Sequence, residues 1–121
     1  MVYCSESRAL AAMELFVNLD PRLAPSNLVF ITADVPDDVI TAIARASLPA
    51  NWHHYPAPDA IKDIGTEWLD RRSSAALLVP SAIVPEEHNL LLNPEHADFA
   101  RIALGQPSEF NFDGRMWKGT P

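Results

Sequence analysis

The chain has 121 residues, of which 48% are hydrophobic and 21% charged, values typical of a single folded domain. Its formal net charge of -7 and the lack of any basic run disfavour binding to nucleic acid or to anionic lipid. No stretch approaches the roughly 20 apolar residues of a membrane span, and no secretory signal is visible. The lone Cys4 excludes an internal disulfide framework. We therefore expect one cytoplasmic domain, with neither nucleic acid nor membrane as a partner.

The N-terminal segment predicts a short strand followed directly by a helix. Residues 2–4 form a β-type run, and apolar side chains then recur at helical spacing over residues 10–17. Ser5 or Ser7 can cap the start of this helix, because a serine hydroxyl accepts a hydrogen bond from a free backbone N–H of the first turn. The chain is thus expected to begin with a strand-to-helix unit.

The middle of the chain alternates strand and helix signals. Residues 27–35 are rich in β-branched and aromatic side chains and predict a strand. Asp37 is then expected to cap a short helix that reaches about residue 43. Residues 47–58 carry aromatic and histidine side chains in an irregular loop, after which apolar spacing predicts a helix over residues 59–72. This order favours helices packed on a sheet.

The last third of the chain predicts short strands joined by turns. Residues 75–80 and 89–93 are apolar runs of strand length, and Phe110 and Phe112 alternate with polar neighbours as in a half-buried strand. Residues 94–104 indicate a brief helix or turn. Because hairpin signals are few, the order of elements predicts an α/β or α+β domain around a mixed sheet.

Two groups of polar residues raise the possibility of a metal site and of a serine hydrolase, and the sequence around each group argues against it. His53 and His54 are adjacent, so their side chains diverge and cannot easily share one metal ion. A serine hydrolase would use Ser81 with His88 as its base, yet the sequence around Ser81 lacks the glycines of a nucleophile elbow. The simpler interpretations are a solvated aromatic loop and a turn after a strand. We expect no metal site.

Glu14 is the carboxylate whose position requires an explanation. It lies in the otherwise apolar stretch ALAAMELF and falls close to Leu10 and Val17 on a helical wheel, near the buried stripe. A carboxylate at a buried edge is costly unless it is paired, hydrogen-bonded or used in function. The pattern alone leaves open whether Glu14 faces solvent or a partner, and Tyr3 alone indicates no more than a core or edge aromatic.

Three segments together resemble the RES-domain family: VYCSESRALAAMELFVNL near the start, then GTEWLDRRSSAALLVPSAIVPEEHNLLLNPEHADF, and the closing FNFDGRMW. The family is named for its arginine, glutamate and serine, and the block VPSAIVPEEHNLLLNPEH is long enough to be specific. The resemblance covers most of the chain. It implies that residues 1–121 form a single RES-like domain of the α+β class, with a mixed sheet, flanking helices and a fold similar to ADP-ribosyltransferases.

A function follows from this resemblance. RES-domain proteins act as the toxins of bacterial toxin–antitoxin pairs and destroy NAD by hydrolysis or phosphorolysis of the nicotinamide–ribose bond. The resemblance therefore implies NAD as substrate, with water or inorganic phosphate as the acceptor, and no cofactor. It implies as partner an antitoxin with an Xre-like helix-turn-helix region, in a homo-oligomer or a hetero-oligomer with that antitoxin.

By the same resemblance Glu14 is the family glutamate, Ser81 the family serine and Tyr3 the active-site tyrosine. Cleavage builds positive charge on the ribose, which a carboxylate such as Glu14 can stabilise. Tyr3 can stack on the nicotinamide or ribose, and Ser81 can hydrogen-bond the carboxamide or a ribose hydroxyl. Glu14 and Ser81 are thus the predicted catalytic residues, and Tyr3 and Ser81 the predicted substrate-binding residues.

The segment before Tyr3 is where the chain departs from the family pattern. The pattern has an arginine and a glycine-rich stretch ahead of the tyrosine, whereas this sequence starts two residues before Tyr3, so we expect an N-terminally incomplete domain. The arginine would pair with the anionic pyrophosphate. Two alternatives stay open: an inactive RES remnant that retains antitoxin binding, and a hydrolase that uses Ser81 with His88. The connection after Ser81 is expected to be framed by three polar residues, Glu86, Glu87 and Asn89.

Overall fold

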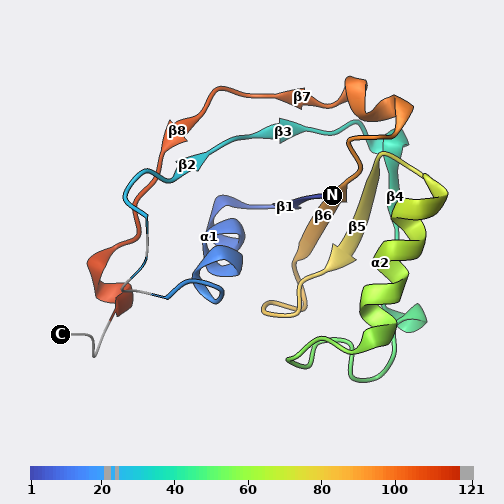
Figure 1. Ribbon diagram of the computed structural model, residues 1–121, viewed down its shortest axis with the longest axis horizontal. Helices are drawn as coiled ribbons and strands as arrows, with labels where there is room; N and C mark the ends of the chain where they lie inside the picture. The colour runs from blue at the N-terminus through green and yellow to red at the C-terminus, as the bar shows by residue number, and fades with distance from the viewer. Residues whose placement is uncertain (21–22, 24, 118–121) are drawn as a thin grey trace.

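The structure, a computed structural model, describes residues 1–20, 23 and 25–117. Its centre is a four-stranded mixed sheet with the strand order β1-β6-β5-β4 (Figure 1). The four strands are short: β1 (Val2–Ser5), β4 (Ile40–Ala42), β5 (Ala76–Pro80) and β6 (His88–Leu92). β4 and β5 run parallel, whereas β6 is antiparallel to both of its neighbours. The predicted α+β class with a mixed sheet is therefore confirmed.

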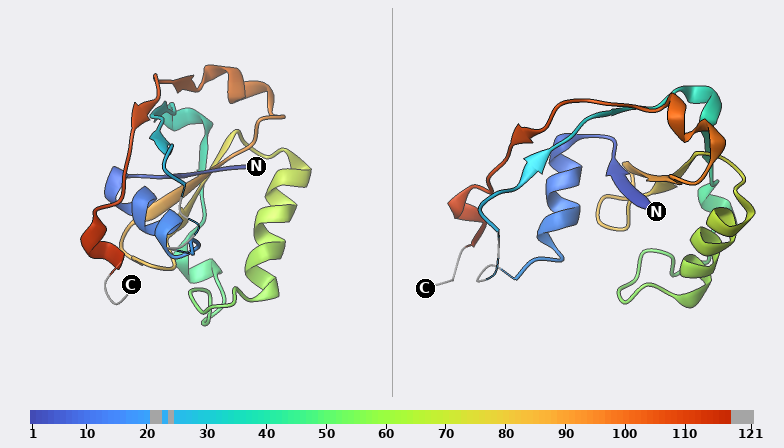
Figure 2. Two further views of the ribbon diagram at one scale, coloured as in Figure 1. Left: turned by 60° about the vertical axis from the view of Figure 1, so that its left-hand side comes forward. Right: turned by 45° about the horizontal axis from the view of Figure 1, so that its top comes forward.

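Two α-helices, α1 (Arg8–Phe16) and α2 (Asp59–Arg71), flank the sheet. Ser7, one of the two predicted caps, accepts a hydrogen bond of 3.1 Å from the Leu10 N–H and starts α1. α2 lies between β4 and β5 in the chain, because parallel strands need a crossover connection. Figures 1 and 2 show α1 and α2 on opposite sides of β5 and β6. No helix in the described ranges is long and apolar enough to cross a membrane.

The two faces of the sheet bury different side chains, because successive residues of a strand point to opposite faces. On one face Leu77 and Leu91 pack with Trp68 of α2. On the other face Ala76 and Leu92 belong to a separate core cluster. The face under α2 is the one that carries the cavity described below.

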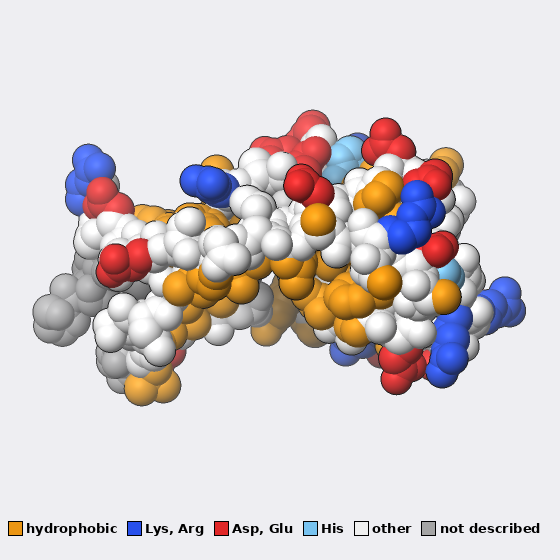
Figure 3. Space-filling model, turned by 90° about the horizontal axis from the view of Figure 1, so that it is seen from above, with side chains coloured by type: hydrophobic (Ala, Val, Ile, Leu, Met, Phe, Trp, Pro, Cys, Tyr) orange, Lys and Arg blue, Asp and Glu red, His pale blue; other side chains and the backbone are white. Residues whose placement is uncertain are grey.

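Two short ribbons form an arm beside the sheet (Figure 1). The ribbons pair β2 (Val29–Phe30) with β8 (Ser108–Glu109), and β3 (Ala33–Asp34) with β7 (Ala103–Leu104). Hydrophobic side chains reach the surface of the molecule on the side of this arm (Figure 3). Exposed hydrophobic residues of the arm include Val29, Ile31 and Leu104.

Three predicted elements differ from the structure. The strand predicted over residues 27–35 is divided into β2 and β3, which pair with different partners. Asp37 does not cap an α-helix, because a single 3-10 turn with Pro36 at its cap leads directly into β4. Phe110 and Phe112 follow β8 rather than extend it, and their rings pack against each other with their centroids 4.9 Å apart. In each case tertiary contacts override the local pattern.

We expect Leu92→Ala to lower the free energy of unfolding by about 2–5 kcal/mol, since truncation of a buried leucine leaves a cavity. Leu92 is 1% exposed and lies opposite both Val2 and Ala76 in the sheet. Leu104→Ala is the control, because Leu104 is 62% exposed and its truncation should change stability by less than about 0.5 kcal/mol. Urea unfolding of both variants measures the difference. Equal effects would contradict the position of the core.

Candidate active site

Ser81 begins the connection between β5 and β6 and is fully buried, with 0% exposure. Its Oγ accepts hydrogen bonds from the backbone N–H groups of Ile83 and Val84, each at 3.1 Å. Its own N–H donates to the Glu87 carbonyl at 2.8 Å. These bonds fold the connection tightly around Ser81, so the predicted turn after a strand is present.

Glu14 reaches Ser81 from helix α1. The Ser81 hydroxyl donates to Glu14 Oε1 at 2.8 Å, and the Asn89 Nδ2 donates to the same oxygen at 2.8 Å. Glu14 is half-buried. The helix-wheel argument left open whether this carboxylate faces solvent or a partner, and the structure shows that it faces two polar partners from the β5–β6 hairpin.

Asn89 is the residue of this cluster that the sequence did not reveal. It was predicted only to frame the connection, but it lies on β6 directly opposite Ser5 of β1. The Ser5 hydroxyl donates to Asn89 Oδ1 at 2.7 Å, which turns the amide nitrogen toward Glu14. The one signal in the sequence was a polar residue ahead of the apolar run LLL. Its partners depend on strand register, which the sequence does not give.

Glu14 is the acceptor of two side-chain hydrogen bonds in this cluster, one from Ser81 and one from Asn89. Two backbone N–H groups occupy the acceptor side of the Ser81 Oγ, so its single proton is directed to Glu14. The Asn89 amide offers Glu14 only donors. Within the described part of the chain, the second oxygen of Glu14, Oε2, has no hydrogen-bond partner. One oxygen therefore fixes the orientation of the side chain, and the other is free to act on a ligand.

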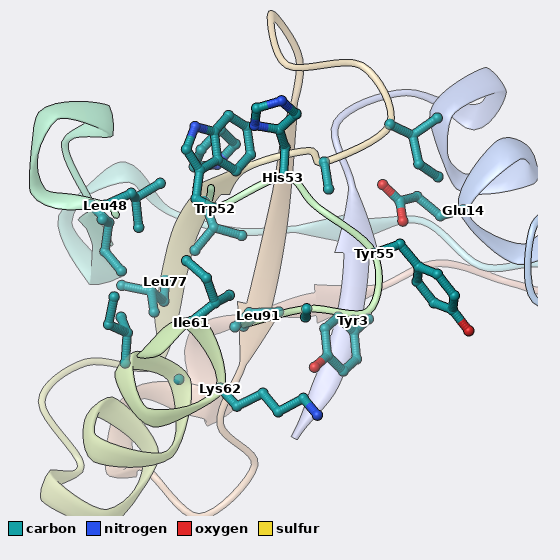
Figure 4. A pocket seen from close by; sticks show the side chains of 18 of the residues that line it. Tyr3, Glu14, Leu48, Trp52, His53, Tyr55, Ile61, Lys62, Leu77 and Leu91 are labelled. Atoms are coloured by element: carbon teal, nitrogen blue, oxygen red, sulfur yellow. The ribbon is translucent and has the colours of Figure 1, made fainter. Parts of the chain in front are cut away.

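A cavity of about 830 Å³ opens beside Glu14. This volume is within the range of roughly 300–1,000 Å³ typical of small-molecule sites. The walls come from β1, from β5 and β6, from the first half of α2 and from the loop before α2 (Figure 4). That loop, predicted to be irregular, contributes a run of aromatic and histidine side chains: Trp52, His53, His54 and Tyr55. Such walls suit a ligand with planar rings.

Tyr3 and Glu14 both line this cavity, whereas Ser81 does not. The register places Tyr3 opposite Leu91, on the sheet face that α2 covers. The Tyr3 side chain is nonetheless 74% exposed, so its ring is available to a ligand. The structure thus brings two of the three predicted site residues to one cavity and places the third, Ser81, directly behind Glu14.

A comparison with known families shows which family this domain belongs to. Residues 1–113 match the family model described as RES domain. The chain belongs to the RES domain family. The resemblance seen in the sequence is therefore confirmed, and the α+β architecture agrees with the ADP-ribosyltransferase-like fold of RES domains.

Curated relatives of this RES domain cover nearly the whole chain. The chain is 40% identical over 116 residues to Toxin Res of Yersinia enterocolitica serotype O:8 / biotype 1B, an alignment that spans 95% of this chain and 76% of that protein. It is 39% identical over 119 residues to the Prs ADP-ribosylating toxin of Sphingobium sp. strain YBL2, with 96% and 74% covered. Toxin Res of Photorhabdus laumondii is 32% identical over 118 residues, with 97% and 76% covered.

The geometry of this RES domain does not support the serine hydrolase alternative. A hydrolase needs an imidazole that accepts the proton of the serine hydroxyl, and here that proton is directed to Glu14. His88 instead lies with its Nδ1 3.7 Å from Glu6 Oε1 at the surface. Across the residues that the structure describes, no group of three His, Cys, Asp or Glu side chains is placed to hold a metal ion.

Cys4 is the neighbour of Tyr3 in β1 but points to the other face of the sheet, where it packs against the core cluster of Leu92. Burial raises the pKa of the Cys4 thiol above its ordinary value, so the thiol is protonated at neutral pH. Cys4 therefore offers no thiolate nucleophile to the cavity.

Proposed function

We propose that this RES domain cleaves the nicotinamide–ribose bond of NAD. The observation that carries the proposal is the Glu14 carboxylate, held by two hydrogen bonds of 2.8 Å at the wall of a cavity that Tyr3 also lines. A fixed negative charge beside an aromatic side chain is the arrangement that stabilises a developing ribosyl cation. The membership of the RES domain family supports the same reaction.

The reaction needs little from the protein beyond this charge. As the bond breaks, its electron pair leaves with the nicotinamide ring, which becomes neutral, and the ribose C1 carbon becomes an oxocarbenium-like cation. The negatively charged Glu14 carboxylate stabilises that cation. The departing nicotinamide needs no general acid, because it leaves as a neutral molecule. In this proposal the Tyr3 ring, which lines the same cavity as Glu14, stacks on the nicotinamide or the ribose.

Ser81 and Asn89 act through Glu14 in this proposal. Both donate to Oε1, and Ser81 is fully buried, so their contribution is to hold the carboxylate in one orientation. A positioned charge costs no reorganisation when the cation forms, which is why oriented groups stabilise a transition state better than mobile ones. Ser81 and Asn89 are thus positioning residues, and Glu14 is the catalytic residue.

The acceptor of the ADP-ribosyl group distinguishes two candidate activities. Water or phosphate would make the domain an NAD-destroying enzyme, whereas a protein side chain would make it an ADP-ribosylating one. The second candidate is favoured by the relative that is named an ADP-ribosylating toxin, which is 39% identical to this chain.

NAD labelled in its adenosine half separates these acceptors. We expect free ADP-ribose in phosphate-free buffer and its 1-phosphate ester when phosphate is added. Label that becomes attached to protein in a cell extract, with little free product, would instead support transfer to a protein. Disappearance of NAD without release of nicotinamide would contradict the proposed bond cleavage.

We further propose that the domain is the toxin of a toxin–antitoxin pair, with an Xre-like antitoxin as its partner. The relatives named Toxin Res support a toxin role. Expression of the chain in bacteria should then lower the cytoplasmic NAD pool and arrest growth. The Glu14→Gln variant, made at the same level, should do neither. Growth arrest by both proteins at an unchanged NAD level would contradict the proposal.

A further inference from the structure

Two charged side chains of opposite sign line the cavity: Glu14 from α1 and Lys62 from the first turns of α2. The other described lining residues are apolar, aromatic, amide, hydroxyl or histidine side chains. Figure 4 shows Lys62 extending across the cavity toward Tyr3, apart from the Glu14 carboxylate. The cavity therefore has an anionic position and a separate cationic position.

Lys62 differs from the arginines of the described chain in lacking a partner there. The Lys62 backbone N–H donates to the Pro58 carbonyl at 3.4 Å, but its ammonium forms no hydrogen bond or ion pair with the residues that the structure describes. Four of the arginines are paired with carboxylates: Arg71 with Glu67, Arg72 with Glu95, Arg101 with Asp38, and Arg115 with Asp113. Arg8 lies over the Phe30 ring, and Arg45 lies over the Trp52 ring and donates to the Pro85 carbonyl. Lys62 is thus a free cation at the wall of the cavity.

This charge distribution fits a dinucleotide with a cationic nicotinamide end and an anionic diphosphate. With the ribosyl cation at Glu14, the diphosphate lies farther along the cavity, where a cation is needed. We infer that Lys62 binds the diphosphate of the substrate and makes the site select phosphate-bearing nicotinamide ribosides. A lysine ammonium suits this task because it acts as a point charge with three donors that adapt to phosphate oxygens. The inference rests on the proposed cleavage of NAD and adds a contact distinct from the family arginine, which precedes the tyrosine in the chain.

Three substrates with the same scissile bond test this inference: NAD, nicotinamide mononucleotide and nicotinamide riboside, which carry two, one and no phosphates. We expect Lys62→Gln to raise the KM for NAD about tenfold, the loss of one charge-assisted hydrogen bond to a partly exposed phosphate. The KM for the riboside should stay unchanged, and kcat should change little for any of them. An equal rise in KM for all three substrates, or an unchanged KM for NAD, would overturn the inference.

Two further variants separate charge from structure. Lys62→Arg keeps a cation and should retain a KM for NAD within about threefold of the native value. Arg71→Gln removes the same charge from the same helix, but Arg71 is paired with Glu67 and does not line the cavity. It should leave the KM for NAD unchanged. A KM for NAD that rises as much in Arg71→Gln as in Lys62→Gln would show a general charge effect and overturn the assignment.

Binding of ADP and adenosine tests Lys62 without any turnover. By calorimetry the native chain should bind ADP more tightly than adenosine, and Lys62→Gln should remove that difference while it leaves adenosine affinity unchanged. If the native chain cleaves no NAD but shows this pattern, the proposed function fails and the role of Lys62 stands. If it cleaves NAD while Lys62→Gln matches it in KM and in ADP affinity, the role of Lys62 alone fails.

Discussion

Glu14→Gln is expected to lower kcat for nicotinamide release from NAD by roughly 10²–10³-fold, the usual cost of removing one preorganised group that stabilises transition-state charge. Glutamine keeps the size of the side chain and an oxygen that accepts from Ser81 and Asn89. It removes the negative charge and puts an amide nitrogen in place of the second carboxylate oxygen. KM should therefore change much less than kcat, because the ribose carries the positive charge mainly in the transition state.

A matched variant distinguishes this effect from a general loss of negative charge. Glu67 lies on α2, is exposed and pairs with Arg71, so Glu67→Gln should leave kcat within about twofold of the native value. Thermal unfolding of both variants controls for stability. A Glu14→Gln variant that retains native kcat, in a folded protein, would exclude the carboxylate from the reaction.

Asn89→Ala is expected to lower kcat by roughly 10–100-fold, as the loss of a hydrogen bond to a charged group is worth about 1.5–3 kcal/mol. Without the amide, Glu14 keeps only the Ser81 donor and is free to rotate. Ser5→Ala should have a smaller effect in the same direction, because Ser5 orients the Asn89 amide without touching Glu14. Steady-state kinetics with NAD measures both variants.

A double-mutant cycle tests whether Asn89 acts through Glu14. If it does, Asn89→Ala should cost little more in a protein that already carries Glu14→Gln, since the oriented charge is then absent. A purely structural role for Asn89 predicts that the two losses multiply. Losses of kcat that multiply would contradict a positioning role for Asn89. A double variant with little more loss than Glu14→Gln alone would support that role.

Much of the fold could be predicted because its signals are local. The helix at Asp59–Arg71 and the strands at Ala76–Pro80 and His88–Leu92 coincide with strong apolar patterns, and Ser7 begins the first helix as its residue type predicts. The paired ribbons of the arm could not be predicted, because two-residue strands carry almost no period and depend on distant partners. The antiparallel hairpin of β5 and β6 was missed for a similar reason: its connection lacks the short Asn-Gly type of turn that marks a hairpin.

The sequence predicted residues of the candidate site but not the hydrogen bonds between them. Glu14 was singled out because a carboxylate near a buried stripe needs a partner, and the structure supplies two. The link between Glu14 and Ser81 spans 67 positions in the chain, and no local pattern carries it. Asn89 needed the register of β1 against β6 before its contact with Ser5 and Glu14 became visible.

Ser81 illustrates how one residue satisfies two interpretations. As a turn residue it accepts hydrogen bonds from Ile83 and Val84, and as a site residue its hydroxyl donates a hydrogen bond to Glu14. The two functions depend on each other, because the backbone donors direct the hydroxyl proton away from the loop. That Ser81 also hydrogen-bonds the substrate stays a prediction, and a KM for NAD that is unchanged in Ser81→Thr and in Ser81→Ala would count against it.

Nicotinamide release from NAD by the purified native chain is the most direct measurement of the proposed activity. With NAD in large excess, release should continue through many turnovers for each protein molecule and should yield one ADP-ribosyl product for each nicotinamide. Release no faster than in a protein-free mixture, from a chain shown to be folded, would contradict catalysis and would leave the inactive RES remnant as the interpretation of this sequence.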